Sequence, residues 1–111
     1  MCIFCQIINK EIPKDFIFAD DQLVAFNDLH PSAPIHILIV SKKHIDSIAT
    51  LKEEDINLIG NMIWRAKVLA EEKGIAKSGY KLIFNCGEDG GQIIQHIHLH
   101  LLGGEKVKCI V

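Results

Sequence analysis

The sequence predicts an α+β domain in which one long helix and a short N-terminal helix accompany a mostly antiparallel sheet of about five strands. Short apolar runs separated by turn-forming residues favour strands over much of the chain. Apolar residues follow a helical period over only one long central stretch. Neighbouring strands are joined by tight turns, which favours antiparallel pairing. The length of 111 residues suits one compact domain over 1–111.

Five strands are expected along the chain. They are Phe16–Ala19, Leu23–Asn27, Ile35–Val40, Tyr80–Asn85 and Ile93–Leu102. The first two are joined by the Asp20-Asp21 turn and make a hairpin. Ile35–Val40 is apolar except at His36, which suits a strand that is buried on both faces. A glycine-rich loop, Gly87–Gly91, joins the last two strands.

Two helices are expected. Residues 3–9 can form one or two helical turns near the N-terminus. The long helix is expected to begin at a capping box, with Thr50 at the N-cap and Glu53 three residues later. Apolar residues then recur at helical spacing to about Lys73, and Gly74 ends the helix.

Charge and composition exclude several classes of partner. The formal net charge is −2 at pH 7, so no basic field marks a protein that binds nucleic acid. No apolar run approaches the roughly 20 residues that span a bilayer, and the first residues lack the layout of a signal peptide. We therefore expect a cytosolic protein with neither a nucleic-acid nor a membrane partner. Disulfides are not expected in that reducing compartment, and Cys86 and Cys109 are interpreted as ordinary thiols.

The alternating segment from His96 to Leu102 carries most of the functional information. Alternate residues of a strand point to one face, so His96, His98 and His100 share a face while the aliphatic residues between them face the core. Three imidazoles in a row have no stability rationale, because each needs a hydrogen-bond partner when buried. An exposed polar face that happens to be rich in histidine is the alternative. The pattern indicates a functional site.

Two chemistries fit these histidines. One is a metal site, because a His-X-His strand can place two imidazoles on one zinc ion. The other is nucleophilic catalysis, because a neutral imidazole can attack phosphorus while its neighbours bind phosphate oxygens and move protons. The strand contains no acidic residue to complete a metal site, and the Gly87–Gly91 loop can offer N–H groups to an anion. These surroundings favour nucleophilic catalysis.

The segment from Gly90 to Gly104 resembles the histidine triad (HIT) signature, in which three histidines alternate with hydrophobic residues. Further segments are similar to the Hint-type branch of that superfamily and follow the same order. They are Ile3-Phe4-Cys5-Gln6-Ile7-Ile8, Lys10-Glu11-Ile12-Pro13, Ala25-Phe26-Asn27-Asp28, Pro34-Ile35-His36-Ile37 and Lys42-Lys43-His44-Ile45. The resemblance covers nearly the whole chain and implies a HIT-like fold.

The resemblance implies a covalent reaction at the α-phosphate of a purine nucleotide conjugate. His98 would attack this phosphate and form a nucleotidyl-histidine, from which water releases a nucleoside monophosphate. His100 would contact the phosphate and assist proton transfer. His36 matches the family's additional histidine, which orients the imidazoles. A core histidine with satisfied hydrogen bonds is the alternative interpretation of His36.

The resemblance also implies a nucleotide site. Asp28 would accept hydrogen bonds from the two ribose hydroxyls. Asn85 and Gly91 would contact the phosphate or the ribose. Four apolar residues would line the base pocket, although core packing explains them equally well: Phe4, Ile7, Phe26 and Leu29. Ile93 stands where Hint-type enzymes commonly carry a serine that assists the leaving nitrogen, so a side-chain donor is missing there, although main-chain contacts can persist.

Cys2 and Cys5 have the Cys-X-X-Cys spacing of half a zinc site. In the zinc-containing members of the superfamily, the two further ligands match His44 and His96. The implied zinc ion is structural, one per chain, with four protein ligands and no open position. A pair of buried cysteines is the alternative. A redox pair fits less well, because no thioredoxin-like βαβ context surrounds the motif.

The resemblance thus predicts a phosphoramidase-like hydrolase or transferase that acts on purine nucleoside 5′-phosphoramidates or related nucleotidyl conjugates. It also implies a homodimer. Two alternatives remain within the superfamily: a Fhit-like dinucleoside polyphosphate hydrolase, and a nucleotide-binding regulatory module without catalysis. A third is a histidine-rich metal-binding protein, which would hold more than one transition-metal ion per chain.

Overall fold

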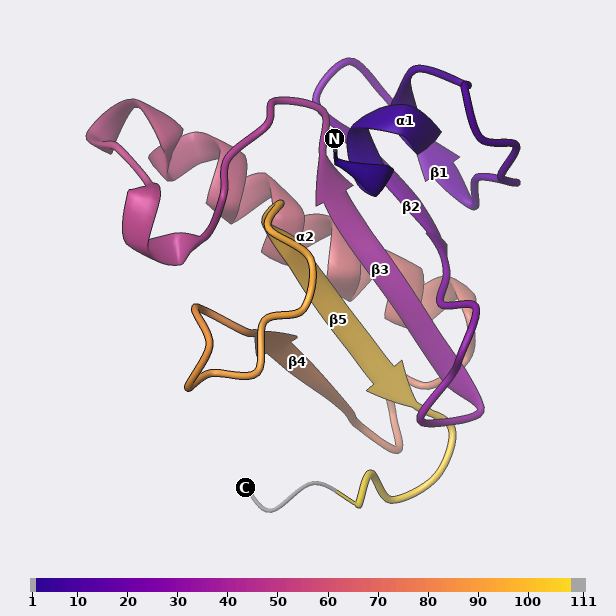
Figure 1. Ribbon diagram of the computed structural model, residues 1–111. Coiled ribbons are helices and arrows are strands. Elements are labelled where there is room, and N and C mark those ends of the chain that lie inside the picture. Colours follow the sequence, from indigo (N-terminus) through magenta and orange to yellow (C-terminus); the bar gives the residue numbers. More distant parts are fainter. Residues whose placement is uncertain (1, 109–111) are drawn as a thin grey trace.

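The computed structural model describes residues 2–108 and contains, within them, one five-stranded sheet (Figure 1). Its strands are β1 (Phe18–Ala19), β2 (Leu23–Asn27), β3 (Ile35–Ser41), β4 (Tyr80–Phe84) and β5 (His98–Gly103). The strand order is β1-β2-β3-β5-β4, and every neighbouring pair is antiparallel. The helices are α1 (Ile3–Ile8) and α2 (Ile56–Glu72), and two 3₁₀ turns, η1 (Ile48–Thr50) and η2 (Glu53–Asp55), precede α2. The predicted α+β class is confirmed.

The two faces of the sheet are covered by different helices (Figure 1). The long helix α2 lies across one face and forms the main core with it. Fully buried side chains of that core include Ile37, Ile39, Met62, Leu99 and Leu101. On the other face, Phe4 and Ile7 of α1 pack against a smaller cluster. The strand residues of that cluster are Val24, Phe26, Leu38 and Val40.

The pairing of β3 with β5 decides where the histidines point. The relevant pairs are Val40–His98, Leu38–His100 and His36–Leu102. Residues that are paired directly across antiparallel strands project to the same face of the sheet. Because Leu38 and Val40 belong to the cluster under α1, the side chains of His36, His98 and His100 project to that face as well.

Most strands agree closely with the prediction. β2 has the predicted bounds, β3 extends to Ser41 and β4 ends at Phe84. β1 is shorter than the predicted Phe16–Ala19, although the N–H of Ile17 still donates to the Ala25 carbonyl at 2.8 Å just before the strand.

The last strand begins later than predicted. β5 starts at His98 rather than Ile93, because the chain bends first. The N–H of His96 turns back to the Ile94 carbonyl at 2.9 Å, and the N–H of Ile97 donates to Ile45 at 2.7 Å. The prediction that His96 projects from the same strand as His98 and His100 is therefore wrong.

The N-terminal end of the long helix also differs from the prediction. α2 starts at Ile56, and the predicted capping box of Thr50 with Glu53 is wrong. The Thr50 hydroxyl is engaged with Ser47 instead, since Thr50 Oγ1 accepts the Ser47 N–H at 3.2 Å. Extended backbone at Leu51 then separates η1 from η2.

The C-terminal ends of both helices lie where the sequence predicted them, within one residue. α1 ends at Ile8, and Lys10 follows with a φ of 62°. α2 ends at Glu72, and Gly74 takes the left-handed conformation with a φ of 74°, which glycine adopts without strain.

Among the described residues, no helix has the length and apolar character needed to cross a membrane. Cys86 is partly buried and carries a free thiol, as predicted. Cys109, for which the same prediction was made, lies outside the described residues.

Candidate active site

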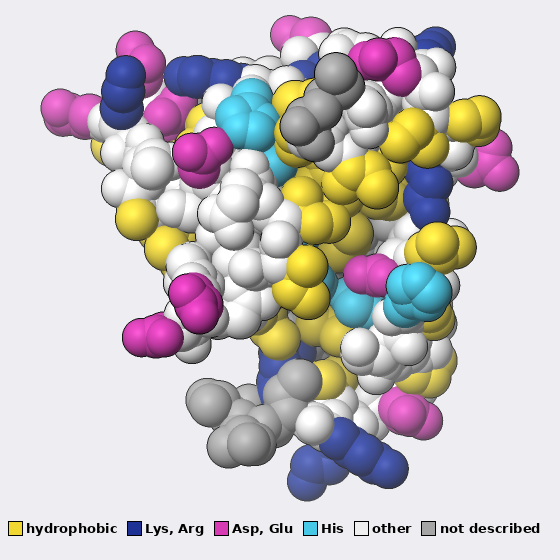
Figure 2. Space-filling model, in the orientation of Figure 1, with side chains coloured by type: hydrophobic (Ala, Val, Ile, Leu, Met, Phe, Trp, Pro, Cys, Tyr) yellow, Lys and Arg dark blue, Asp and Glu magenta, His cyan; other side chains and the backbone are white. Residues whose placement is uncertain are grey.

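Two groups of histidines lie in the structure. The first is His36, His98 and His100, and the second is His44 and His96 together with Cys2 and Cys5. Figure 2 shows histidine side chains at two places on the face that carries α1, with hydrophobic side chains between them. These two groups are the two sets that the sequence analysis assigned to catalysis and to a zinc site.

The ring of His98 is held so that one nitrogen is available for chemistry. Its Nδ1 lies 2.7 Å from the main-chain carbonyl oxygen of His96. A carbonyl only accepts, so Nδ1 carries the proton and Nε2 of the neutral ring keeps its lone pair. The residue is 8% exposed, and Phe4 of α1 packs edge-on against it with ring centroids 5.1 Å apart. This arrangement suits a nucleophile that attacks through Nε2.

His36 and His100 form a hydrogen-bonded pair next to Asp28. The Nε2 of His36 is 2.9 Å from Nδ1 of His100 and 3.5 Å from Oδ2 of Asp28. On the other side of its ring, His36 Nδ1 accepts the main-chain N–H of Ser32 at 3.0 Å. The rings of His98 and His100 have centroids 5.0 Å apart. Contacts therefore run from the main chain of Ser32 through His36 to His100, whose ring lies beside that of His98.

Burial lowers the pKa of all three imidazoles. Burial has the largest effect on the pKa of His100, and the neighbouring His98 and His36 lower it further, while the charge of Asp28 raises it. The resulting pKa of His100 is about 4. Burial also lowers the pKa of His98, against the hydrogen bond to the His96 carbonyl and the charge of Asp28. The pKa of His36 is lowered by burial against Asp28 as well. The three rings are neutral near pH 7, so each offers one N–H and one lone pair.

The residues predicted to line a base pocket occupy two different settings. Phe4, Ile7 and Phe26 are buried in the core between α1 and the sheet. Leu29, on the loop after β2, is 77% exposed. The first three fill core space in this structure, and Leu29 presents an apolar side chain to solvent. Base contact by these residues stays a prediction.

Asn85 and Gly91 shape the loop between β4 and β5. The Asn85 side-chain amide donates to the Gly90 carbonyl at 2.7 Å. Gly91 has a φ of 77°, and its N–H donates to the Glu88 carbonyl at 3.0 Å. Both residues thus have intramolecular partners here, and their contacts with a nucleotide stay predictions.

Gln92 organises the same loop, a role that the sequence reasoning missed. Its Oε1 accepts the Gly87 N–H at 3.0 Å, and its Nε2 donates to the carbonyls of Asp46 at 2.6 Å and Ile94 at 3.0 Å. The side chain is buried, so these bonds satisfy an amide that would otherwise be costly to bury. The available signal was a polar residue directly after the glycines of the loop.

The four predicted zinc ligands lie together. His96 Nδ1 lies 3.3 Å from Cys2 Sγ, 3.6 Å from Cys5 Sγ and 3.1 Å from His44 Nδ1. His44 Nδ1 in turn lies 3.3 Å from Cys5 Sγ. All four ligand atoms lie within 4.8 Å of one another. Four such ligands bound tetrahedrally to zinc would lie about 3.3–3.8 Å apart. The cluster therefore has the donor atoms and the size of a zinc site.

Both histidines of this cluster are oriented to bind through Nδ1. The Nε2 of His96 donates to the Ser41 carbonyl at 2.6 Å, and that of His44 donates to Asp46 Oδ1 at 2.8 Å. With Nε2 protonated, each neutral ring keeps its lone pair on the nitrogen that faces the cysteines. An oxygen acceptor behind the ligating ring is typical of metal-bound histidines. Neither Ser41 nor Asp46 was predicted from the sequence.

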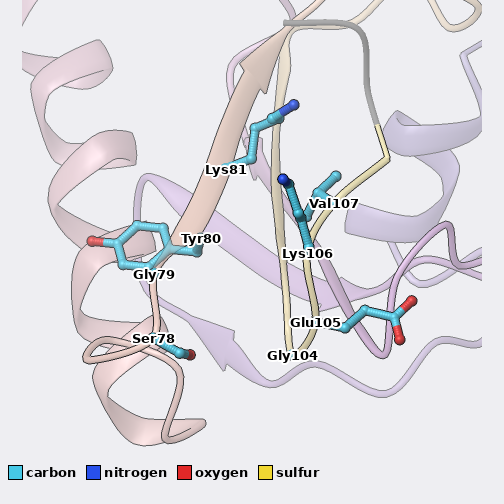
Figure 3. Close-up of a pocket in the computed structure, with 8 residues that line it drawn as sticks. All are labelled: Ser78, Gly79, Tyr80, Lys81, Gly104, Glu105, Lys106 and Val107. Carbon is cyan, nitrogen blue, oxygen red and sulfur yellow. The ribbon is translucent and has the colours of Figure 1, made fainter.

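Two hollows lie near the ends of β5. One, of about 460 Å³, borders the Cys–His cluster and is lined in part by Ile3, Ile93 and Gln95. Ile93, at the position where the resemblance to Hint-type enzymes implies a serine, is 91% exposed and places an apolar side chain at the surface. The other, of about 550 Å³, lies between the start of β4 and the segment after β5, where Lys81 and Lys106 line it (Figure 3). None of the predicted site residues lines this second hollow.

The sequence and the fold both match known proteins. Residues 1–109 match the family model described as "Scavenger mRNA decapping enzyme C-term binding". An uncharacterized HIT-like protein of Buchnera aphidicola is 45% identical over 112 residues, which cover 99% of this chain and 100% of that protein. The chain belongs to the histidine triad superfamily.

Other HIT proteins are similar to this one over most of their length. The purine nucleoside phosphoramidase of Escherichia coli is 46% identical over 105 residues, which cover 95% of this chain and 88% of that protein. The crystal structure of a HIT family hydrolase from Legionella pneumophila superposes with a TM-score of 0.93 at 46% identity, over 96% of this chain and 95% of that chain. A histidine triad protein from Clostridium difficile gives a TM-score of 0.94 at 43% identity, over 99% and 96%. The HIT-like fold is confirmed.

Proposed function

We propose that this HIT protein is a Hint-type nucleotidyl hydrolase or transferase that acts on purine nucleoside 5′-phosphoramidates or related nucleotidyl conjugates. The observation that carries the proposal is the hydrogen bond of His98 Nδ1 to the His96 carbonyl, because it leaves the Nε2 lone pair for attack at neutral pH. The relative from Escherichia coli, 46% identical, is named a purine nucleoside phosphoramidase. That name supports the substrate class.

The proposed reaction passes through a covalent nucleotidyl-histidine. Nε2 of His98 attacks the α-phosphorus, a P–N bond forms, and the bond from phosphorus to the leaving group breaks with its electron pair on the leaving group. The leaving group takes up a proton from solvent, with His100 placed to assist the transfer, while the His96 carbonyl stabilises the positive His98 ring through Nδ1–H. Water then attacks phosphorus and the P–N bond breaks. The nucleoside monophosphate and a proton are released, and His98 is neutral again.

Asp28 is proposed to hold the ribose. Its side chain is 21% exposed, and its Oδ1 accepts the His30 N–H at 2.8 Å. A carboxylate offers about four lone-pair sites, so it can accept two vicinal hydroxyls in addition. Asn85 and Gly91 would contact the phosphate or ribose from the glycine loop, and Leu29 would contact the base.

Cys2, Cys5, His44 and His96 are proposed to hold one structural zinc ion per chain. The support is their donor set, their spacing and the oxygen acceptors behind both histidines. A bound zinc ion would supply a closed four-ligand cross-link without an open position for water. These residues connect α1 and the end of β3 with the bend ahead of β5, and so they hold the carbonyl that orients His98.

A cytosolic homodimer stays our prediction for the assembly and location of the protein. Size-exclusion chromatography with light scattering measures the first. The expected result is a mass of about twice the chain mass of 12.4 kDa.

Turnover of adenosine 5′-phosphoramidate and of diadenosine polyphosphates tests the proposed reaction. We expect release of AMP from the phosphoramidate by the wild-type protein, and a loss of at least about 10³-fold in kcat in His98→Ala. Mass spectrometry of rapidly quenched wild-type protein should detect a nucleotidylated chain that His98→Ala lacks. His30→Ala, which removes an exposed histidine outside the three-imidazole group, is the matched control.

Each contrary result has a distinct meaning. Unchanged turnover in His98→Ala would refute the mechanism. Faster turnover of diadenosine polyphosphates would identify a Fhit-like hydrolase. Binding of AMP without turnover of any conjugate would identify a regulatory module.

A further inference from the structure

A main-chain N–H decides the tautomer of His36. The N–H of Ser32, in the loop between β2 and β3, lies 3.0 Å from His36 Nδ1. A main-chain N–H can only donate, so this nitrogen of His36 must hold a lone pair. The neutral ring therefore carries its proton on Nε2.

The tautomer of His36 in turn decides that of His100. The contact between His36 Nε2 and His100 Nδ1 is 2.9 Å long. Taken alone, this contact could run in either direction, because either nitrogen could carry the proton. Since His36 Nε2 carries it, His100 Nδ1 accepts, and the proton of His100 sits on its own Nε2.

Asp28 adds to this effect without replacing it. Its Oδ2 lies 3.5 Å from His36 Nε2, which is longer than the range of about 2.7–3.2 Å typical of a hydrogen bond to nitrogen. The carboxylate favours a proton on that nitrogen through its charge. The Ser32 N–H makes the shorter and better-defined contact with the His36 ring.

The loop that presents this N–H is constrained on both sides. Pro31 precedes Ser32 and Pro34 follows it closely, and proline fixes its own φ angle. The N–H of Asp28 donates to the His36 carbonyl at 2.9 Å, and that of His30 donates to Asp28 Oδ1. The N–H is thus aimed at His36 by bonds within the loop and does not depend on a substrate.

We propose that Ser32 is a positioning residue, whose main-chain N–H sets the tautomers of His36 and His100 so that His100 presents an N–H to a phosphate oxygen. The inference rests on the proposed nucleotidyl transfer, because the α-phosphate is the group that His100 would contact. With the opposite tautomer, a lone pair of His100 would face a phosphate oxygen and repel it. Because burial keeps the rings of His36 and His100 neutral, the tautomer of His100, and not its charge, decides whether it presents an N–H or a lone pair to the phosphate.

Nitrogen-15 NMR of the wild-type protein at neutral pH tests the assignment directly. We expect His36 and His100 to be neutral with the proton on Nε2. We also expect a coupling through the hydrogen bond between the Ser32 amide nitrogen and His36 Nδ1. A proton on Nδ1 of either histidine would overturn the proposal.

Two variants remove the N–H of Ser32. One replaces the amide of Ser32 by an ester, which keeps the side chain and exchanges only N–H for oxygen, and the other is Ser32→Pro. In both, the nitrogen shifts of His100 should move toward those of a tautomer mixture, and kcat should fall about 10- to 100-fold with KM changed less than about threefold. Ser32→Ala keeps the N–H and is expected to keep the wild-type nitrogen shifts.

The readouts separate the possible failures. A fall in kcat with wild-type nitrogen shifts would overturn the proposal, because Ser32 would then act through loop structure alone. Where circular dichroism shows that Ser32→Pro does not fold, the ester variant and the wild-type spectrum decide. A wild-type protein without turnover of any nucleotidyl conjugate would refute the proposed function, whereas the nitrogen shifts would still decide the tautomer assignment.

Discussion

Replacing His100 with glutamine is expected to make the free energy of unfolding less sensitive to acid. Burial, reinforced by His98 and His36, lowers the pKa of His100 to about 4 in the folded chain, against about 6.5 for an unperturbed histidine. Between about pH 6.5 and 4, His100 therefore binds a proton in the unfolded chain but stays mostly neutral in the folded chain. The corresponding part of the free energy of unfolding is fully present above the pKa of the histidine in the unfolded chain, and it is lost as the pH falls from about 6.5 toward 4. Glutamine does not titrate, so the variant lacks this loss.

The size of the effect follows from the two pKa values. At about pH 5 an unfolded histidine is almost fully protonated, whereas a group with a pKa of about 4 is about nine-tenths neutral. This difference lowers the stability by about 2 kcal/mol between about pH 7.5 and 5. His100 is only partly shielded from solvent, so screening reduces the expected loss to about 1–2 kcal/mol. Since domains are typically stable by about 5–15 kcal/mol, this change is measurable.

Urea unfolding at both pH values measures the effect. The wild-type protein is expected to lose about 1–2 kcal/mol more than His100→Gln between about pH 7.5 and 5. His30→Gln, at an exposed histidine, is expected to follow the wild type. The Cys–His cluster is the same in all three proteins, so protonation of its ligands cancels in the comparison. Equal losses in the wild type and in His100→Gln would refute the reasoning.

Three further perturbations test the surroundings of the site. Cys5→Ser is expected to lose the zinc ion while Cys86→Ser keeps one per chain, as measured by elemental analysis; retained zinc in Cys5→Ser would exclude the four-ligand site. Phe4→Ala is expected to cost about 3–5 kcal/mol in urea unfolding, because it leaves a cavity beside the His98 ring; a cost below about 1 kcal/mol would show that α1 contributes little packing there. Gln92→Leu is expected to cost about 1–3 kcal/mol, since the partly buried Gly87 N–H and two carbonyls lose their partner, and a neutral outcome would mean that water or the loop itself satisfies them.

The sequence predicted the central part of the sheet because its signals there are local. The apolar run ending at Val40 and the alternation around Leu99 correspond to β3 and β5, whose aliphatic residues facing α2 lie in the core. The prediction failed where tertiary hydrogen bonds override the pattern. Alternation continues back through His96, yet the chain bends there, and the bonds that hold the bend reach residues as distant as Ile45 and Ser41.

Within the candidate site, the grouping of the side chains was predictable from the sequence and the main-chain contacts were not. Cys2 and Cys5 were indicated as candidate zinc ligands by their spacing, and His44 by the resemblance to a known superfamily. The N–H of Ser32 and the carbonyl of Ser41 orient imidazoles through groups that every residue possesses. Such groups leave no compositional signal, so only the folded geometry identifies them.

The bend that the strand prediction missed is also what allows the hydrogen bond that orients the His98 ring. In a regular β-strand, the carbonyl of His96 would point in the plane of the sheet toward a neighbouring strand and would be engaged in the ladder. Because β5 begins only at His98, that carbonyl lies outside the ladder and accepts from His98 Nδ1 instead. The same bend turns the His96 ring toward Cys2 and Cys5. His96 thus belongs to the Cys–His cluster through its ring and orients the His98 ring through its carbonyl, and a regular strand could not supply both contacts.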